Sequence, residues 1–230
     1  MRVSPSENEE KSENRYPWWI TFIIGNEFCE RYAYYGMRAV LVLYLSNFLG
    51  FSKDVSTEIY HAYIAMAYMT PLLGAIISDS FWGKFKTIII FSIIYAAGMI
   101  TMAVSAVEFS DEATSFNIIL CLVSLTIVAF GTGGIKPCVV TLGADQFPKT
   151  DQGAEWMKDY FAFFYASINS GSLLAIFITP IVRSHGSYFI AFLIPAVIMA
   201  LAILLFLFGS KLYIKDKPRM VTLVTYWSIH

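Results

Sequence analysis

The segment 17–48 reads PWWITFIIGNEFCERYAYYGMRAVLVLYLSNF, a long apolar stretch with charged residues in its middle. A helix needs about 20 mostly apolar residues to cross a bilayer, and this segment is longer than that. Its polar residues are spaced so that they share one face of a helix with about 3.6 residues per turn. The remaining surface of Ile, Phe, Val, Leu and Tyr suits lipid or packed helices. The polar residues on the shared face are Glu27, Glu30, Arg31, Tyr34 and Arg38.

Several ionisable side chains on one membrane helix indicate a function. Each costs at least ~2.5 kcal/mol on insertion scales, so such groups normally line a cavity or a proton path. The alternative is that the two glutamates and Arg31 only neutralise each other as a structural pair. A structural pair does not need the additional polar residues on the same face, which favours a transport site.

The composition supports a membrane protein. The 230 residues are 57% hydrophobic and 14% charged, with a mean hydropathy of +0.60, whereas soluble domains average about 45–50% apolar and about 25% charged residues. The net charge of -1 gives no indication of a nucleic-acid partner. The sequence also lacks metal-ligand spacing, a nucleophile elbow and a phosphate-binding loop, so we expect no enzyme activity and no metal site.

Six segments are long and apolar enough to cross a membrane, which predicts an all-α membrane protein. They cover residues 17–48, 55–79, 86–107, 115–142, 160–183 and 186–209. The polar residues 1–15 are interpreted as a disordered cytoplasmic tail, residues 16–210 as the six-helix unit, and residues 211–230 as a cytoplasmic linker with an atypical tail. With the N-terminus in the cytoplasm, the outside connections hold only Lys53 and Arg183 as basic residues. The positive-inside rule therefore favours two cytoplasmic ends.

Two further ionisable residues lie within the predicted spans. Lys136, in the run GTGGIKP, lies too deep for an interfacial residue; it either balances a glutamate of the first helix or binds an anion that competes for it. His61 is a candidate for proton exchange, because histidine is the side chain that ordinarily changes its charge near neutral pH, but a lone membrane histidine also serves as a packing residue. Tyr68 lies seven residues after His61 on the same face. In the fifth segment, Tyr165 and Asn169 share a polar face that fits either interhelical hydrogen bonding or substrate contact.

The connection between the second and third segments, GAIISDSFWGKFKT (74–87), has a specific composition. Gly74 and Gly83 permit close approach and a tight turn, and Asp79 is placed to interact with a helix N-terminus or a neighbouring basic group such as Lys84. By itself this is equally well an ordinary basic loop. The pattern resembles the signature between helices two and three of the major facilitator superfamily.

Three stretches resemble the proton-dependent oligopeptide transporter family, most closely its animal intestinal and renal members. They are NEFCERYAYYGMR (26–38), GTGGIKP with GADQF (131–137 and 143–147) and FFYASINSGSL (163–173), in the order and spacing of that family. The resemblance covers nearly everything from about Tyr16 to Ser210. It implies the six-transmembrane-helix N-terminal bundle of the major facilitator fold.

The resemblance also implies roles for individual residues. Proton coupling falls to Glu27, Glu30, Arg31 and His61, with no cofactor beyond the proton gradient as driving force. Arg31 and Lys136 correspond to residues near the carboxylate of a bound peptide, and Lys136 matches the lysine that pairs with a first-helix glutamate. The remaining pocket positions are Tyr34, Tyr35, Arg38, Tyr68, Tyr165 and Asn169. These residues are expected to form half of a central cavity for di- and tripeptides.

Family members have twelve core helices, and this chain has six. We therefore expect the N-terminal half of a proton-coupled di- and tripeptide symporter in the plasma membrane, not competent for transport without the missing C-terminal half. One alternative is a truncated, non-transporting product that associates with a full-length relative. Another is a family member that moves a different anion such as nitrate; the complete Glu-x-x-Glu-Arg face with Lys136 favours a peptide carboxylate.

Overall fold

The computed structural model describes residues 16–107, 115–216 and 218. The predicted 1–15 tail and nearly all of the predicted tail after residue 216 lie outside these residues. Within the described chain, six helices have the length of a membrane span, and their bounds are α2 Ile20–Asn47, α3 Lys53–Ile77, α4 Lys84–Ser105, α5 Ser115–Ala144, α6 Asp151–His185 and α7 Tyr188–Phe208. A π-helical turn, Ser78–Trp82, follows α3, and a 3-10 turn, Gly209–Lys211, follows α7. No strand occurs in the described residues, and the all-α prediction is confirmed.

Five of these helices are apolar enough as well as long enough to cross a membrane. The exception by hydropathy is α2, whose 28 residues correspond to roughly 42 Å of helix, longer than the bilayer core. Its charged residues lower its mean hydropathy, yet three of them are buried inside the bundle. The prediction of six spans is therefore confirmed by combining length with burial.

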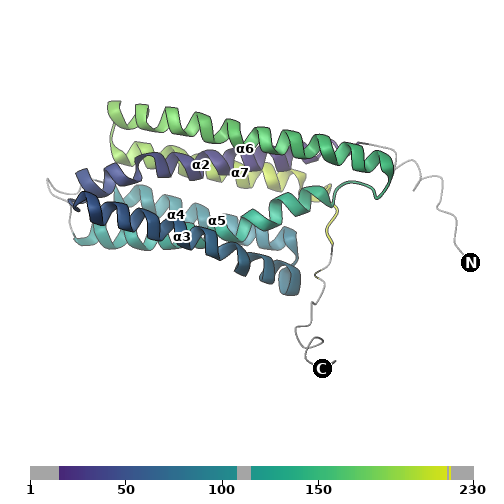
Figure 1. Ribbon diagram of the computed structural model, residues 1–230, viewed down its shortest axis with the longest axis horizontal. Helices are drawn as coiled ribbons and strands as arrows, with labels where there is room; N and C mark the ends of the chain where they lie inside the picture. The colour runs from purple at the N-terminus through teal and green to yellow at the C-terminus, as the bar shows by residue number, and fades with distance from the viewer. Residues whose placement is uncertain (1–15, 108–114, 217, 219–230) are drawn as a thin grey trace, which may run out of the picture.

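The helices lie side by side in one elongated bundle. Figure 1 shows α2, α6 and α7 together in the upper half of the view and α3, α4 and α5 in the lower half. The main packing pairs are α4 with α5, α2 with α6, α2 with α7 and α3 with α5, while α4 and α7 join the two halves. We call the end where the chain leaves α7 the exit end; α2 and α6 begin there, and α5 ends there.

Helix starts follow ordinary capping chemistry. The side chains of Ser52, Thr150 and Ser187 accept hydrogen bonds from the backbone N–H of Val55, Gly153 and Ile190. The Thr150 cap starts α6 at Asp151, nine residues before the predicted apolar span at 160, so the predicted boundary was too late. Hydropathy alone missed this charged first part because it is helical without being apolar.

Glycines set the spacing of α5 against its neighbours. A Cβ on Gly131 would lie 2.6 Å from Cα of Tyr95, and one on Gly134 would lie 2.2 Å from the ring of Phe91. Gly133 likewise packs against Thr70. Only a glycine permits this distance between helix axes, so α5 is packed closely against α3 and α4.

A buried polar network joins α2, α4 and α5 at the end opposite the exit end. The hydroxyl of Tyr44 donates to the backbone oxygen of Ser105 at 2.7 Å, and the side-chain amide of Asn117 donates to the same oxygen at 2.8 Å. Tyr44 and Ser105 are fully buried. The network satisfies the carbonyl of Ser105 near the end of α4 and fixes the three helices together.

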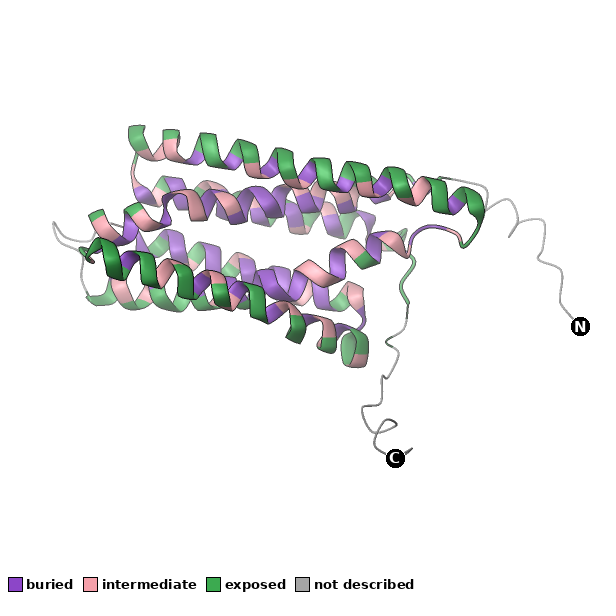
Figure 2. Cartoon of the chain, viewed as in Figure 1, coloured by how far each residue is buried: buried purple, intermediate pink, exposed green. Residues whose placement is uncertain are grey.

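The exposed apolar residues concentrate on two helices. In Figure 2, the outer faces of α6 and α3 are largely green, whereas α2 is mostly purple. Of the five apolar spans, those of α3 and α6 are the least buried. Large exposed side chains on these faces include Tyr68, Leu72, Ile76, Phe163, Tyr165 and Phe177. These two helices therefore present surfaces that lipid or further protein would cover.

Candidate functional site

The charged residues of α2 form a buried cluster around one guanidinium group. Nε of Arg31 lies 3.0 Å from Oε1 of Glu27, and Nη2 of Arg31 pairs with Oε2 of Glu30. Glu30 is completely buried, and Glu27 and Arg31 are only 5% and 6% exposed. Thr132 of α5 donates a hydrogen bond to the other oxygen of Glu30 at 2.9 Å. The structure thus brings the three predicted ionisable residues together inside the bundle, away from the lipid-facing surface.

Tyr34 is the centre of the cationic part of the site. Its ring lies 5.5 Å from Cζ of Arg31, 5.2 Å from Cζ of Arg38 and 4.9 Å from Nζ of Lys136. These separations are within the range of cation–π attraction. Nζ of Lys136 also lies 4.8 Å from the ring centre of Tyr68. Side chains of α2, α3 and α5 therefore meet at one place.

Lys136 forms no ion pair with a carboxylate of the described residues. Among the described residues, the ion pairs of Glu27 and Glu30 are with Arg31, and none joins either glutamate to Lys136. The family-type pair between Lys136 and a first-helix glutamate is therefore not formed here, because Arg31 occupies both carboxylates. The cluster contains three cationic side chains and two carboxylates, which leaves one positive charge in excess.

Arg38 lies in an aromatic cage on the side of the cluster farther from the exit end. Its Nη2 donates to the hydroxyl of Tyr60 at 2.7 Å, and its Cζ lies 5.5 Å from the Tyr35 ring. The ring of His61 is 5.5 Å from that of Tyr60. His61 itself is exposed on α3. It therefore contacts Tyr60, which binds Arg38, but it lies outside the buried part of the cluster.

Two predicted site residues lie on the open side of the bundle. Tyr165 and Asn169 are exposed on α6, and neither forms a hydrogen bond, ion pair or ring contact with the charged cluster within the described chain. Tyr68 is 63% exposed, and its ring contacts the cluster through Lys136. The structure therefore divides the predicted residues into a buried charged core and an exposed polar set.

Sequence reasoning missed several residues of the buried core. Tyr60 and Thr132 bind Arg38 and Glu30 directly. The hydroxyls of Tyr34, Tyr63 and Tyr95 are buried and have no hydrogen-bond partner among the described residues. Thr132 lies four residues before Lys136 and therefore on the same face of α5, a spacing that could have indicated it. The unpartnered hydroxyls mark the core as a place where polar groups can still accept or donate bonds.

The 74–87 connection has part of the predicted geometry. A Cβ on Gly74 would lie 2.6 Å from Cα of Gly134, and Gly83 has a φ of +76°, so both glycines are required where they stand. Lys84, however, pairs with Asp145 at the end of α5. Of the two alternatives for Asp79, the ion pair with a neighbouring basic group is not formed between described residues. Asp79 is exposed in the first turn of the π-helical segment, and its interaction with a helix N-terminus stays a prediction.

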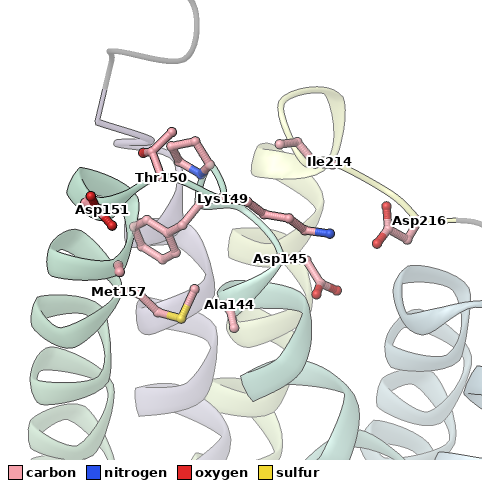
Figure 3. Close-up of a pocket in the computed structure, with 11 residues that line it drawn as sticks. Ala144, Asp145, Lys149, Thr150, Asp151, Met157, Ile214 and Asp216 are labelled. Carbon is pink, nitrogen blue, oxygen red and sulfur yellow. The ribbon is translucent and has the colours of Figure 1, made fainter.

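A cavity of about 610 Å³ lies at the exit end, between the α5–α6 connection and the chain that leaves α7. Figure 3 shows Asp145, Lys149, Asp151 and Asp216 around it. No predicted site residue lines this cavity. It is therefore separate from the charged cluster, and the cluster is the candidate site.

Comparison with known proteins gives a consistent result. The family model PTR2, described as the POT family, matches residues 85–226. The chain is 45% identical to Solute carrier family 15 member 1 from Rattus norvegicus over 221 residues, and 47% identical to Solute carrier family 15 member 2 from Danio rerio over 215 residues. These alignments cover 89% and 91% of this chain, and 31% and 30% of the relatives. The chain thus spans about three tenths of the length of these curated relatives.

Solved structures support the same assignment. The POT family transporter PepTSo, crystallised in meso, superposes with a TM-score of 0.80 at 33% identity, over 89% of this chain and 40% of that one. An auto-inhibited POT family peptide transporter gives a TM-score of 0.79 at 35% identity, over 88% and 39%. The bundle therefore matches one part of a larger transporter fold.

Proposed function

The chain belongs to the POT family, and from this premise we propose that it is the N-terminal half of a proton-coupled symporter for di- and tripeptides. The family's members are peptide transporters and not enzymes. The observation that carries the proposal is the cluster of the buried Arg31 and the partly buried Lys136 and Arg38 around the buried ring of Tyr34. A transporter for a short peptide needs a site of this kind near the middle of the membrane.

The excess positive charge gives the cluster its specificity. Lys136 is held against two aromatic rings and not by a carboxylate, so its ammonium can bind an incoming anion without breaking an ion pair. The carboxylate of a peptide would bind between Lys136 and Arg31 and form charge-assisted hydrogen bonds there. A hydrophobic residue in either position could not replace this interaction.

Proton coupling would use the partner exchange at Arg31. A peptide carboxylate that binds Arg31 competes with Glu27 and Glu30 for the same guanidinium. A glutamate that loses this partner in a dry site takes up a proton more readily. A proton on Glu27 or Glu30 would therefore free Arg31 and favour binding of the peptide, and loss of the proton would favour its release. The exposed His61 is a third candidate for taking up the proton. In this way the movement of protons would be coupled to the movement of the peptide.

The remaining part of the site would come from a second six-helix half. Tyr68 on α3 and Tyr165 and Asn169 on α6 are exposed on the two least buried membrane helices. A second half that packs against these faces would bury them and bring Tyr165 and Asn169 to the substrate. We also propose that residues 16–210 are this half, that both ends are cytoplasmic and that the membrane is the plasma membrane.

A chimera tests the proposal. Residues 16–216 replace the matching part of one of the relatives, and uptake of a labelled dipeptide is measured with and without an inward proton gradient. The proposal expects uptake that depends on the gradient in the chimera and no uptake by this chain alone. Uptake by the chain alone would contradict the assignment as a half, and a chimera that reaches the membrane but transports nothing would contradict the assigned substrate.

A further inference from the structure

The chain that follows α7 begins inside the hydrophobic core. The ring of Tyr213 is centred 5.2 Å from that of Phe206 and 6.2 Å from that of Phe85, and Tyr213 is only 6% exposed. Gly209 makes room for this ring, because a Cβ there would lie 2.2 Å from the Tyr213 hydroxyl. Tyr213 is therefore anchored in the core, while its neighbours Leu212 and Ile214 have exposed side chains.

The next residue, Ile214, is bound through its backbone by the side chain of Gln146. Oε1 of Gln146 accepts from the N–H of Ile214 at 2.8 Å, and Nε2 donates to the carbonyl of Ile214 at 3.1 Å. The amide thus pairs with Ile214 as a neighbouring strand would. Gln146 is 2% exposed, so the amide that makes these bonds is itself buried, although the side chain of Ile214 is exposed.

The same amide holds two further elements. Oε1 of Gln146 also accepts from the indole N–H of Trp19 at 3.1 Å, at the start of α2, and Nε2 also donates to the carbonyl of Leu142 in α5 at 2.9 Å. Both acceptor sites and both donor hydrogens of the amide are therefore used. One side chain joins the end of α5, the first turn of α2 and the chain that leaves α7.

The path continues across the exit end of the bundle. Nζ of Lys215 lies 4.0 Å from the ring centre of Phe85 at the start of α4. The backbone oxygen of Asp216 lies 3.5 Å from the Cβ position of Gly83, in the turn before α4. Figure 3 shows Ile214 and Asp216 on this segment, across the cavity from Thr150, Asp151 and Met157. Ile214 and Asp216 form one wall of the cavity of about 610 Å³.

We propose that residues 212–216 form a docked strap and that Gln146 is the positioning residue that clamps it. The strap fixes the point where the polypeptide leaves the bundle, beside the turn between α3 and α4. Through Trp19 it also fixes the first turn of α2, the helix that carries Glu27, Glu30 and Arg31. The exit point and the start of the charged helix therefore move as one body. The strap does not depend on the proposed transport function.

Hydrogen exchange of the unmodified chain in lipid nanodiscs tests the strap directly. A docked strap protects the Ile214 amide, so its exchange is expected to be at least about 100-fold slower than that of an unstructured amide. Exchange within about tenfold of the unstructured rate would overturn the proposal. This measurement needs no substitution, so it decides the question independently of how any variant folds.

Limited trypsin digestion tests the clamp, with cleavage after Lys215 followed by mass spectrometry. Gln146→Leu removes all four bonds and is expected to speed this cleavage at least about tenfold. Gln152→Leu, at an exposed glutamine of α6, is the matched control and should leave it unchanged. Protection of the buried Cys138 thiol shows that the bundle is intact. Unchanged cleavage in Gln146→Leu would overturn the role of Gln146.

If the Cys138 thiol becomes reactive in Gln146→Leu, the narrower change Ile214→Pro takes its place. Of the four bonds of the Gln146 side chain, this change removes only the one donated by the Ile214 N–H; it also replaces the isoleucine side chain and fixes the backbone φ at this position. Faster cleavage after Lys215 with a protected Cys138 supports the clamp, and cleavage at the rate of the unmodified chain contradicts it.

Discussion

Nε of Arg31 lies 3.0 Å from Oε1 of Glu27, one helical turn away on α2. The same guanidinium also pairs with the completely buried Glu30. Two carboxylates in a membrane helix thus share one cation. This makes Arg31 the residue on which the stability of the charged cluster depends.

Arg31→Met is expected to lower the free energy of unfolding by about 3–5 kcal/mol, because it leaves two buried carboxylates without a partner. Chemical denaturation in detergent, followed by tryptophan fluorescence, measures the change. The exposed Lys158→Met on α6 is the control and should change little. Equal stability of Arg31→Met and Lys158→Met would show that the glutamates do not need this cation.

A second prediction concerns the close packing of α5. Gly134→Ala puts a Cβ 2.2 Å from the Phe91 ring and is expected to destabilise the bundle by about 1–3 kcal/mol through overpacking. Gly25→Ala, whose Cβ would lie 3.4 Å from the nearest atom of Leu205, is the matched control. Thermal melting of both variants measures the difference, and equal melting temperatures would contradict the packing seen here.

A third prediction concerns the network that joins α2, α4 and α5. Tyr44→Phe removes the hydroxyl that donates to the backbone oxygen of Ser105 and is expected to cost about 1 kcal/mol. Tyr165→Phe, at an exposed tyrosine, should cost nothing measurable. The same denaturation assay measures the free energy of unfolding of both variants. Equal values for the two variants would contradict the network.

A fourth prediction concerns the proposed orientation. Lys53→Cys, at the start of α3, should react with a membrane-impermeant maleimide in intact cells, whereas Lys86→Cys and Lys158→Cys should react only after permeabilisation. All three positions are exposed, and the three native cysteines are buried, so background labelling is low. The reverse pattern would invert the proposed topology.

The membrane helices were predictable because hydropathy and length act locally along the chain. The same reasoning placed the start of α6 at residue 160, since the helical residues from Asp151 onward are charged and their cap, Thr150, gives no hydropathy signal. The close approach of Gly74 to Gly134 was predictable in kind, because small residues in apolar helices indicate contact. The identity of Gly134 as the partner of Gly74 was not predictable, because the local sequence does not specify which residues of two helices come into contact.

The site was predictable at the level of residues and less so at the level of pairs. A lysine deep in an apolar span indicated that Lys136 acts in the site. Its position over the rings of Tyr34 and Tyr68 depends on three helices, and on Arg31 having already taken both carboxylates. The bonds of Gln146 to Trp19 and Ile214 join residues 127 and 68 positions away. Such contacts follow from the assembled bundle and have no signature in the sequence.

The central claim of the proposed function is that Lys136, which forms no ion pair with a carboxylate of the described residues, receives the peptide carboxylate. Dipeptide uptake by the chimera described above, at matched surface expression, tests it most directly. Lys136→Ala is expected to raise KM by about 10–100-fold, because it removes a charge-assisted bond worth ~1.5–3 kcal/mol, while Lys136→Arg loses less and Lys158→Ala stays at the level of the unmodified chimera. Uptake by Lys136→Ala that equals that of the unmodified chimera would contradict the account.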